Sequence, residues 1–427
     1  MSNWPMHLLS ALVLCLGAVV PVMAQLQFER EPINYAAAAN DPVTQLQKSL
    51  ESGKTALDYD EEHGYLPALL ELLDIDTSSQ VLVYSKTSFQ LRRISPRRPR
   101  ALYFNEHSYV GWVQGGDVIE IMTTDPDQGE IFYTLEQEKV ERPQFVRDRG
   151  QCIVCHASSR TQGVPGGLVR SMFVDAGGQP HYGSGTFTID HTSPFSERWG
   201  GWYVTGTHGS MRHMGNIIST DRQRPETVDR EAGANITDLK EKLNVEPYLT
   251  PHSDIVALMI LEHQTQMQNF LTLANFECRI ASHYDASMNK ALDRPADYVS
   301  DTTRRRIENV GDKLLRYMLM ADEFQLTSPV KGTSDFAAHF QQQGPRDSQG
   351  RSLRDLDLQT RMFKYPCSYL IYSASFDQLP ATVKNHVATR LRAILTGEDK
   401  SEEFTHLSAA DRRNILEILD ETKPELW

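Results

Sequence analysis

Five short runs of β-branched and aromatic residues, followed by a change to helical spacing, constrain the fold of this chain most strongly. Gly115-Gly116 and the segment Asp125–Gly129 separate the runs as turns, which indicates a meander of antiparallel strands. The runs are Val81–Tyr84, Ala101–Phe104, Tyr109–Val113, Val118–Met122 and Ile131–Leu135. The sequence therefore predicts a β-rich region in the first half of the chain.

Apolar residues at helical spacing flank this region on both sides. Before it, leucines recur from about Val43 to Leu73. After Asp254, helices are expected over Ile255–Ile280, Arg304–Phe324, Ala381–Leu395 and Ala409–Leu419. Residues 163–215 are rich in glycine and predict loops and short strands, with a hairpin turn at residues 176–178. The polar run 331–352 is expected to be a mobile loop. Together these patterns predict an α+β fold with a mainly helical C-terminal half.

The first 24 residues have the pattern of a signal peptide. An apolar stretch from Leu8 to Val20 precedes Val22-Met23-Ala24, which resembles a cleavage site. The n-region has no Lys or Arg, so an uncleaved anchor is the alternative. Thirteen apolar residues are too few to span a bilayer comfortably, and the mature chain has no longer apolar stretch. We therefore expect an exported protein, in the periplasm, with no integral membrane span in the mature chain.

The chain is acidic, with a formal net charge of −13. Nucleic acids and anionic membranes bind basic surfaces that release their counterions, so this charge disfavours them as partners.

Residues 152–156 read Cys-Ile-Val-Cys-His. Two thiols one turn apart can reach both vinyl groups on one side of a porphyrin, and the histidine that follows can ligate its iron. For this composition the motif is expected about 0.002 times by chance. It predicts one covalent haem c held by Cys152 and Cys155, with His156 as the iron ligand.

Two cysteines at this spacing also occur in three other kinds of site. A thioredoxin-like redox pair belongs in a βαβ unit, which this neighbourhood lacks. A zinc site needs four ligands, and no second pair follows at conventional spacing, although four residues separate His208 and His213. A disulfide between Cys152 and Cys155 would be short and strained. The haem interpretation is the strongest of the four.

The segment from Arg149 to His156 resembles the haem-binding segment of c-type cytochromes. The wider chain also resembles exported proteins with a single cytochrome c haem, through the segments 99–105, 201–209 and 364–369. The resemblance implies thioether bonds at Cys152 and Cys155 and iron ligation by His156. In small cytochromes the motif lies near the start of a helical domain, whereas here it lies in mid-chain. The ordinary small cytochrome c fold is therefore not expected.

The second axial ligand of the iron is not determined by the motif. Four candidates lie between 52 and 58 residues after His156, namely Met214, Met211, His213 and His208. For each methionine the alternative is apolar packing, and for each histidine it is a hydrogen-bonded loop residue. Arg212 could pair with a haem propionate.

Two further features carry weaker signals. Five arginines at positions 92, 93, 97, 98 and 100 could hold propionates or dock an anionic redox partner, or could form a solvated loop. Cys278 and Cys367 remain once the motif and the leader are set aside. In an oxidising compartment they are expected to pair, with two buried thiols as the alternative.

These observations divide the chain into four regions: a signal peptide (1–24), a helix and β-rich region (25–140), a haem-binding segment (141–220) and a helical region (250–427). The leading hypothesis is electron transfer by Fe(II)/Fe(III) cycling with a redox partner protein or small molecule. A haem enzyme with an open distal site, acting on peroxide or another small molecule, is the alternative. A haem sensor or a subunit of a redox complex is the third class. The sequence does not indicate an oligomeric state.

Overall fold

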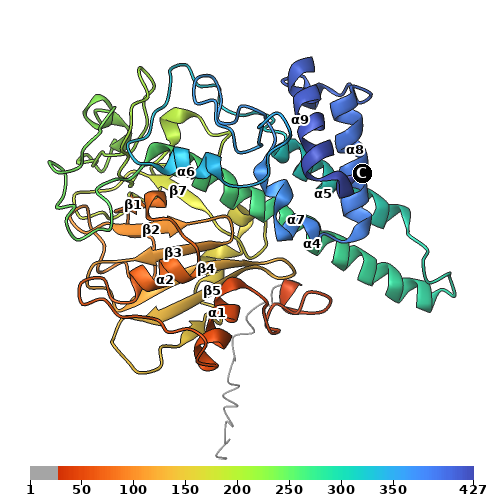
Figure 1. Cartoon of the computed structure of the whole chain (residues 1–427), viewed down its shortest axis with the longest axis horizontal. Helices are drawn as coiled ribbons and strands as arrows, with labels where there is room; N and C mark the ends of the chain where they lie inside the picture. Colours follow the sequence, from red (N-terminus) through yellow and green to blue (C-terminus); the bar gives the residue numbers. More distant parts are fainter. Residues whose placement is uncertain (1–26) are drawn as a thin grey trace, which may run out of the picture.

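The computed structural model describes residues 27–427 and has the predicted α+β fold (Figure 1). The signal peptide predicted over residues 1–24 lies outside the described residues. One antiparallel sheet fills the first half of the described chain, and helices dominate the second.

The sheet has six strands that follow one another in chain order, each antiparallel to the next. The strands are β1 (Val81–Val83), β2 (Arg100–Phe104), β3 (Ser108–Trp112), β4 (Val118–Asp125), β5 (Gly129–Glu136) and β6 (Phe145–Arg147). The predicted meander is confirmed. Strand β6 was missed, because its three residues are half-buried or exposed and form no apolar run.

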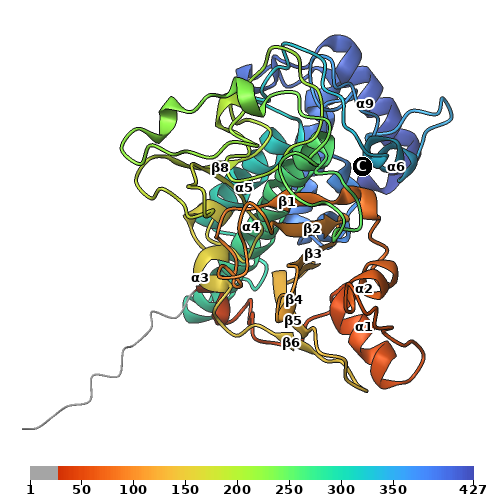
Figure 2. The ribbon, with the colours of Figure 1, turned by 90° about the vertical axis from the view of Figure 1, so that its left-hand side faces the viewer.

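The N-terminal helices α1 (Pro42–Glu51) and α2 (Leu66–Leu72) cover one face of the sheet (Figure 2). Ile119 and Ile121 point into this layer, since alternate residues of a strand share a face. The helical pattern over residues 43–73 is broken in its middle. Gly53 and Gly64 adopt left-handed φ angles of 69° and 63°, which end one helix and precede the next.

The other face of the sheet packs against α4 (Ile255–Ala291), a helix of 37 residues. The side chain of Asp254 caps its first turn, and Gln264 donates a hydrogen bond to the Tyr109 hydroxyl of β3 at 2.8 Å. The helix continues past the predicted end at Ile280, because its later residues pack against α5.

The C-terminal half contains α5 (Asp301–Met318), α6 (Phe336–Gln342), α7 (Ala374–Asp377), α8 (Ala381–Thr396) and α9 (Ala409–Thr422). Helix α5 ends before the predicted Phe324, because Met320 and Asp322 adopt left-handed φ angles of 58° and 61°. The expectation of a loop throughout residues 331–352 is wrong. Helix α6 lies within this run and buries Phe336 and Phe340 in the core.

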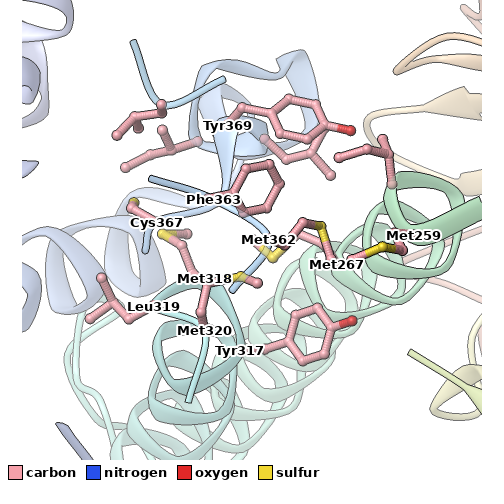
Figure 3. Close-up of a cluster of buried hydrophobic side chains, with 14 of the residues drawn as sticks. Met259, Met267, Tyr317, Met318, Leu319, Met320, Met362, Phe363, Cys367 and Tyr369 are labelled. Atoms are coloured by element: carbon pink, nitrogen blue, oxygen red, sulfur yellow. The ribbon is translucent and has the colours of Figure 1, made fainter. Parts of the chain in front are cut away.

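The expected disulfide between Cys278 and Cys367 is also wrong. Both residues are free thiols, at most 1% exposed. Figure 3 shows Cys367 among the methionine and aromatic side chains of the C-terminal core, beside Met318 and Leu319. Burial raises the pKa of the Cys367 thiol to about 12, so this group packs as a small apolar side chain.

The segment between the sheet and α4 contains α3 (Ile153–His156) and a hairpin of β7 (Val169–Met172) and β8 (Thr186–Ile189). The predicted turn is present, with Gly178 at a φ of 82°. A bridge from Val83 to Trp202 and a hydrogen bond from the Met172 amide to the Gly200 carbonyl tie the hairpin to the edge of the sheet. Short strands and loops were predicted here, and both are confirmed.

Candidate functional site

The Cys-Ile-Val-Cys-His motif forms a single helical turn, α3. The amides of Cys155 and His156 both donate to the Cys152 carbonyl, at 3.1 and 3.0 Å. Before the turn, the Asp148 carboxylate accepts the backbone N–H groups of residues 150, 151 and 152 at 3.0–3.1 Å. Asp148 therefore fixes the start of the turn. Both cysteines are free thiols, with Cys155 exposed and Cys152 partly buried.

The His156 ring is held in one orientation. Its Nδ1 lies 2.9 Å from the Gly166 carbonyl oxygen, and its ring centroid lies 4.9 Å from that of Phe132 on β5. A carbonyl oxygen only accepts hydrogen bonds, so Nδ1 carries the hydrogen and Nε2 keeps a lone pair. Burial lowers the pKa of His156, which favours the neutral ring. A neutral imidazole with a free Nε2 is the form that binds metal ions.

Two glycines bring the carbonyl of residue 166 into place. A Cβ at Gly166 would lie 2.0 Å from the Asn269 Oδ1, and one at Gly167 would lie 2.9 Å from the Met122 side chain. Asn269, on α4, donates to the Gly167 carbonyl at 2.8 Å. Only a chain without side chains at 166 and 167 can run this close to α4. The Gly166 carbonyl thus fixes the His156 ring. This role was not predicted from the sequence, although the run Pro165-Gly166-Gly167 is typical of a backbone that passes close to another segment.

The sheet beside α3 is only partly covered. Leu102, Gly111, Glu120 and Thr134 lie side by side across β2 to β5, and three of them are half-buried, with Gly111 fully buried. The Arg100 guanidinium covers Gly111 and bonds to Glu120 at 2.7 Å. Residues on the opposite face of the same strands are buried under α1 and α2. A half-covered surface that carries a paired arginine and glutamate therefore adjoins the motif.

Burial raises the pKa of the Cys152 thiol to about 12. The carboxylates of Asp148 and Glu120 act in the same direction, whereas Arg100 lowers this pKa. The structure therefore favours the neutral thiol at position 152.

Each of the four candidate distal ligands is buried with packing or hydrogen-bond partners of its own. Met214 packs against β7, where its sulfur accepts the Ser171 hydroxyl at 3.8 Å. Successive residues of a strand point to opposite faces, so the neighbouring Arg170 points the other way. The electrostatic neighbours of Arg170 include Cys155. Strand β7 therefore lies between Met214 and the motif.

The other three candidates are held in the same buried layer as Met214. Both ring nitrogens of His208 have backbone partners, with Nδ1 at 2.8 Å from the Met211 carbonyl and Nε2 accepting the Asn235 amide at 3.0 Å. His213 accepts the Gly215 amide at Nδ1, at 2.9 Å, and its ring lies 5.3 Å from that of Trp199. Met211 is 6% exposed and packs in the core that contains Trp199.

A buried ionic network in the same layer was not predicted. The Arg198 guanidinium donates to Glu262 Oε1 at 2.5 Å, and the Trp199 indole donates to Oε2 at 3.2 Å. Nearby, the Nδ1 atoms of His191 and His263 lie 2.9 Å apart, so one ring donates to the other. Burial raises the pKa of Glu262 to about 8, against the opposing effect of Arg198. Adjacent Glu262 and His263 are the only sequence signal, and both are at 0% exposure.

The arginine-rich loop is largely solvated. Arg92, Arg97 and Arg98 are exposed, and Arg93 pairs with Asp117 at 2.7 Å. Arg212, the other candidate for a propionate, makes two hydrogen bonds of 2.7 Å to Glu231. Its charge is therefore already neutralised.

A hollow of about 720 Å³ lies in the C-terminal half, lined by residues that include Arg316, Glu323, Arg361 and His406. None of its lining residues belongs to the motif. Within residues 27–427, no three His, Cys, Asp or Glu side chains gather as ligands for a metal ion. The described helices also include none with the length and apolar character needed to cross a membrane.

The chain was compared with protein-family models, with curated proteins and with solved structures, and none of the three comparisons gave a match.

Proposed function

We propose that this chain is an exported c-type cytochrome of the periplasm that carries one covalent haem and transfers electrons to or from a redox partner. Cys152 and Cys155 would form the thioether bonds, and His156 would ligate the iron. One observation carries the proposal. The motif is a single turn whose histidine donates Nδ1–H to the Gly166 carbonyl, which leaves Nε2 for a metal.

The surroundings fit a porphyrin in two further respects. The thiols at 152 and 155 are both unpaired, with one exposed and one partly buried. Beside the motif, the half-buried Leu102 and Met122 and the buried Phe132 line this face of the sheet, and apolar side chains of this kind suit the body of a macrocycle. Haem would supply an iron that cycles between Fe(II) and Fe(III).

Residues of the chain orient the imidazole, exclude water from it and balance the charge beside it. The Gly166 carbonyl holds the proton on Nδ1 of His156, which fixes the ring and makes Nε2 a better donor to metal. Phe132 packs against the imidazole and excludes water from that side of the ring. The Arg100–Glu120 pair keeps the half-buried sheet surface electrically neutral.

A second function is a haem enzyme with an open sixth position. The observation in its favour is that Met211, Met214, His208 and His213 are held in another layer by their own partners. An open position binds small molecules, whereas an occupied one favours electron transfer.

The decisive experiment is expression with a haem-attachment system and a pyridine haemochrome assay on the purified, denatured protein. We expect one haem c per chain in the wild-type protein. The double variant Cys152→Ser/Cys155→Ser should carry no covalently bound haem, and the control Cys278→Ser should keep all of it. Exported wild-type protein without covalent haem would contradict the proposal.

Carbon monoxide separates the two functions. A ferrous spectrum that does not change under carbon monoxide indicates six-coordinate iron and electron transfer. A spectrum that shifts at once indicates an open site and favours the enzyme.

A further inference from the structure

Arg170 on β7 is a positive charge without a negative partner. Its side chain is half-buried, and its Nε has no hydrogen-bond partner. Among residues 27–427 no carboxylate lies within 4.0 Å of it. Leaving a partly buried guanidinium unpaired costs solvation free energy that a bound anion would recover.

The surroundings of Arg170 add positive charge. Its electrostatic neighbours are Arg160, Tyr182 and Cys155. Burial, followed by the repulsion of Arg160, lowers the pKa of Arg170. Arg160 is exposed and has no carboxylate partner among the described residues either. Two arginines thus lie near an exposed thiol of the motif with no acid to balance them.

Three other arginines near the motif or in the layer behind β7 pair with carboxylates. Arg100 pairs with Glu120 at 2.7 Å, Arg198 with Glu262 at 2.5 Å and Arg212 with Glu231 at 2.7 Å. Arg170 differs from these three in having no carboxylate partner, and from the exposed arginines in being half-buried with an unpartnered Nε.

We propose that Arg170, assisted by Arg160, binds a propionate carboxylate of the haem attached at Cys152 and Cys155. The assignment rests on the proposed function. A planar guanidinium matches a carboxylate with two parallel N–H···O bonds, and such charge-assisted bonds are the strong ones. The position also replaces the two earlier candidates, since Arg212 is already paired and Arg92, Arg97 and Arg98 are solvated.

Arg170 has an electrostatic consequence for the site. Ferric haem carries one more positive charge than ferrous haem, so a nearby cation stabilises the reduced state. Removing that cation, and leaving the propionate unbalanced, lowers the midpoint potential. Arg170 is accordingly a positioning residue that also tunes the potential.

The test compares Arg170→Gln and Arg170→Lys with wild type, with Arg212→Gln as the matched control. Two measurements are made on protein shown by haemochrome assay to carry haem c. They are the midpoint potential at fixed pH and ionic strength, and the propionate bending band in the resonance Raman spectrum. We expect R170Q to lower the potential and shift the band. R170K should keep the potential closer to wild type yet shift the band, because an ammonium cannot bind in the bidentate manner.

An unchanged potential and band in R170Q would overturn the assignment while leaving the haem intact. Equal shifts in R212Q would overturn it too, since they would show a general effect of surface charge. If R170Q yields no haem protein, R170K decides alone: a wild-type band then counts against the proposal. Wild-type protein without haem c would refute the proposed function itself.

Discussion

Asp254 joins the start of α4 to residues 333–334 through one buried carboxylate. At Oδ1 it accepts the amides of Val256 and Ala257, at 2.8 and 3.3 Å, which caps α4. At Oδ2 it accepts the amide of Thr333 at 2.7 Å, and the amide and hydroxyl of Ser334 at 2.8 and 2.9 Å. The residue is 1% exposed, so water cannot replace it.

The loss expected from Asp254→Ala follows from these bonds. The missing cap costs about 1 kcal/mol. Two backbone amides at residues 333 and 334 lose their acceptor, at roughly 1.5 kcal/mol each. The free energy of unfolding should therefore fall by about 4 kcal/mol, or roughly 5 °C in Tm for a chain of this length. Asp254→Asn keeps the cap but turns an NH₂ group toward three donors, so it should lose about 3 kcal/mol.

Urea denaturation followed by circular dichroism measures both variants. The matched control is Ser408→Ala, which removes the capping box of α9 and should cost only about 1 kcal/mol. This account of the carboxylate would be refuted if Asp254→Asn unfolded with the same free energy as wild type. It would also be refuted if Asp254→Ala lost no more free energy of unfolding than the control.

Three other outcomes are expected. Burial raises the pKa of Glu130 to about 8 from 4.5, so the unfolded chain ionises first and stability falls as pH rises across that interval, by at most roughly 1.4 kcal/mol per unit. Urea curves at pH 5 and pH 8 should therefore differ less for Glu130→Gln than for wild type, and an equal difference would exclude this role. Iodoacetamide should label both Cys278 and Cys367 in denatured, unreduced protein, whereas a disulfide-linked peptide in the mass spectrum would contradict the free thiols. Met214→Leu and His213→Gln should leave the haem absorption bands in place, and a spectrum of altered ligation in either would place that residue on the iron.

The spacing of apolar residues predicted the strands and helices in which that spacing continues without interruption. The meander followed from β-branched runs, and α4 from apolar residues after the capping Asp254. The predicted helical run over 43–73 was broken because Gly53 and Gly64 turn the chain, and leucine spacing alone does not reveal a turn. Pattern also failed at α6, where Phe336 and Phe340 gain their burial from distant segments.

The candidate site divides in the same way. Cys152, Cys155 and His156 are adjacent in sequence, so their common turn needed no knowledge of the fold. The distal candidates were chosen by distance along the chain, which does not reveal that β7 lies in between. Arg170 was missed for a similar reason. What distinguishes it is the lack of a nearby acid, and that is a property of the folded structure only.

Helix α4 determines when the proposed haem-binding turn becomes covered as the chain folds. At roughly 55 Å it is long enough to contact two hydrophobic cores, one among the C-terminal helices and one between the sheet and the N-terminal helices. Leu273 packs against each of them. It also supplies Asn269, which donates a hydrogen bond to the Gly167 carbonyl. The preceding carbonyl, that of Gly166, is the one that holds the His156 ring. During synthesis and export the thiols at 152 and 155 emerge about a hundred residues before that support, so there is an interval in which α4 has not yet docked. Any chemistry at those thiols within that interval takes place on an uncovered turn, and docking of α4 then closes the site behind it.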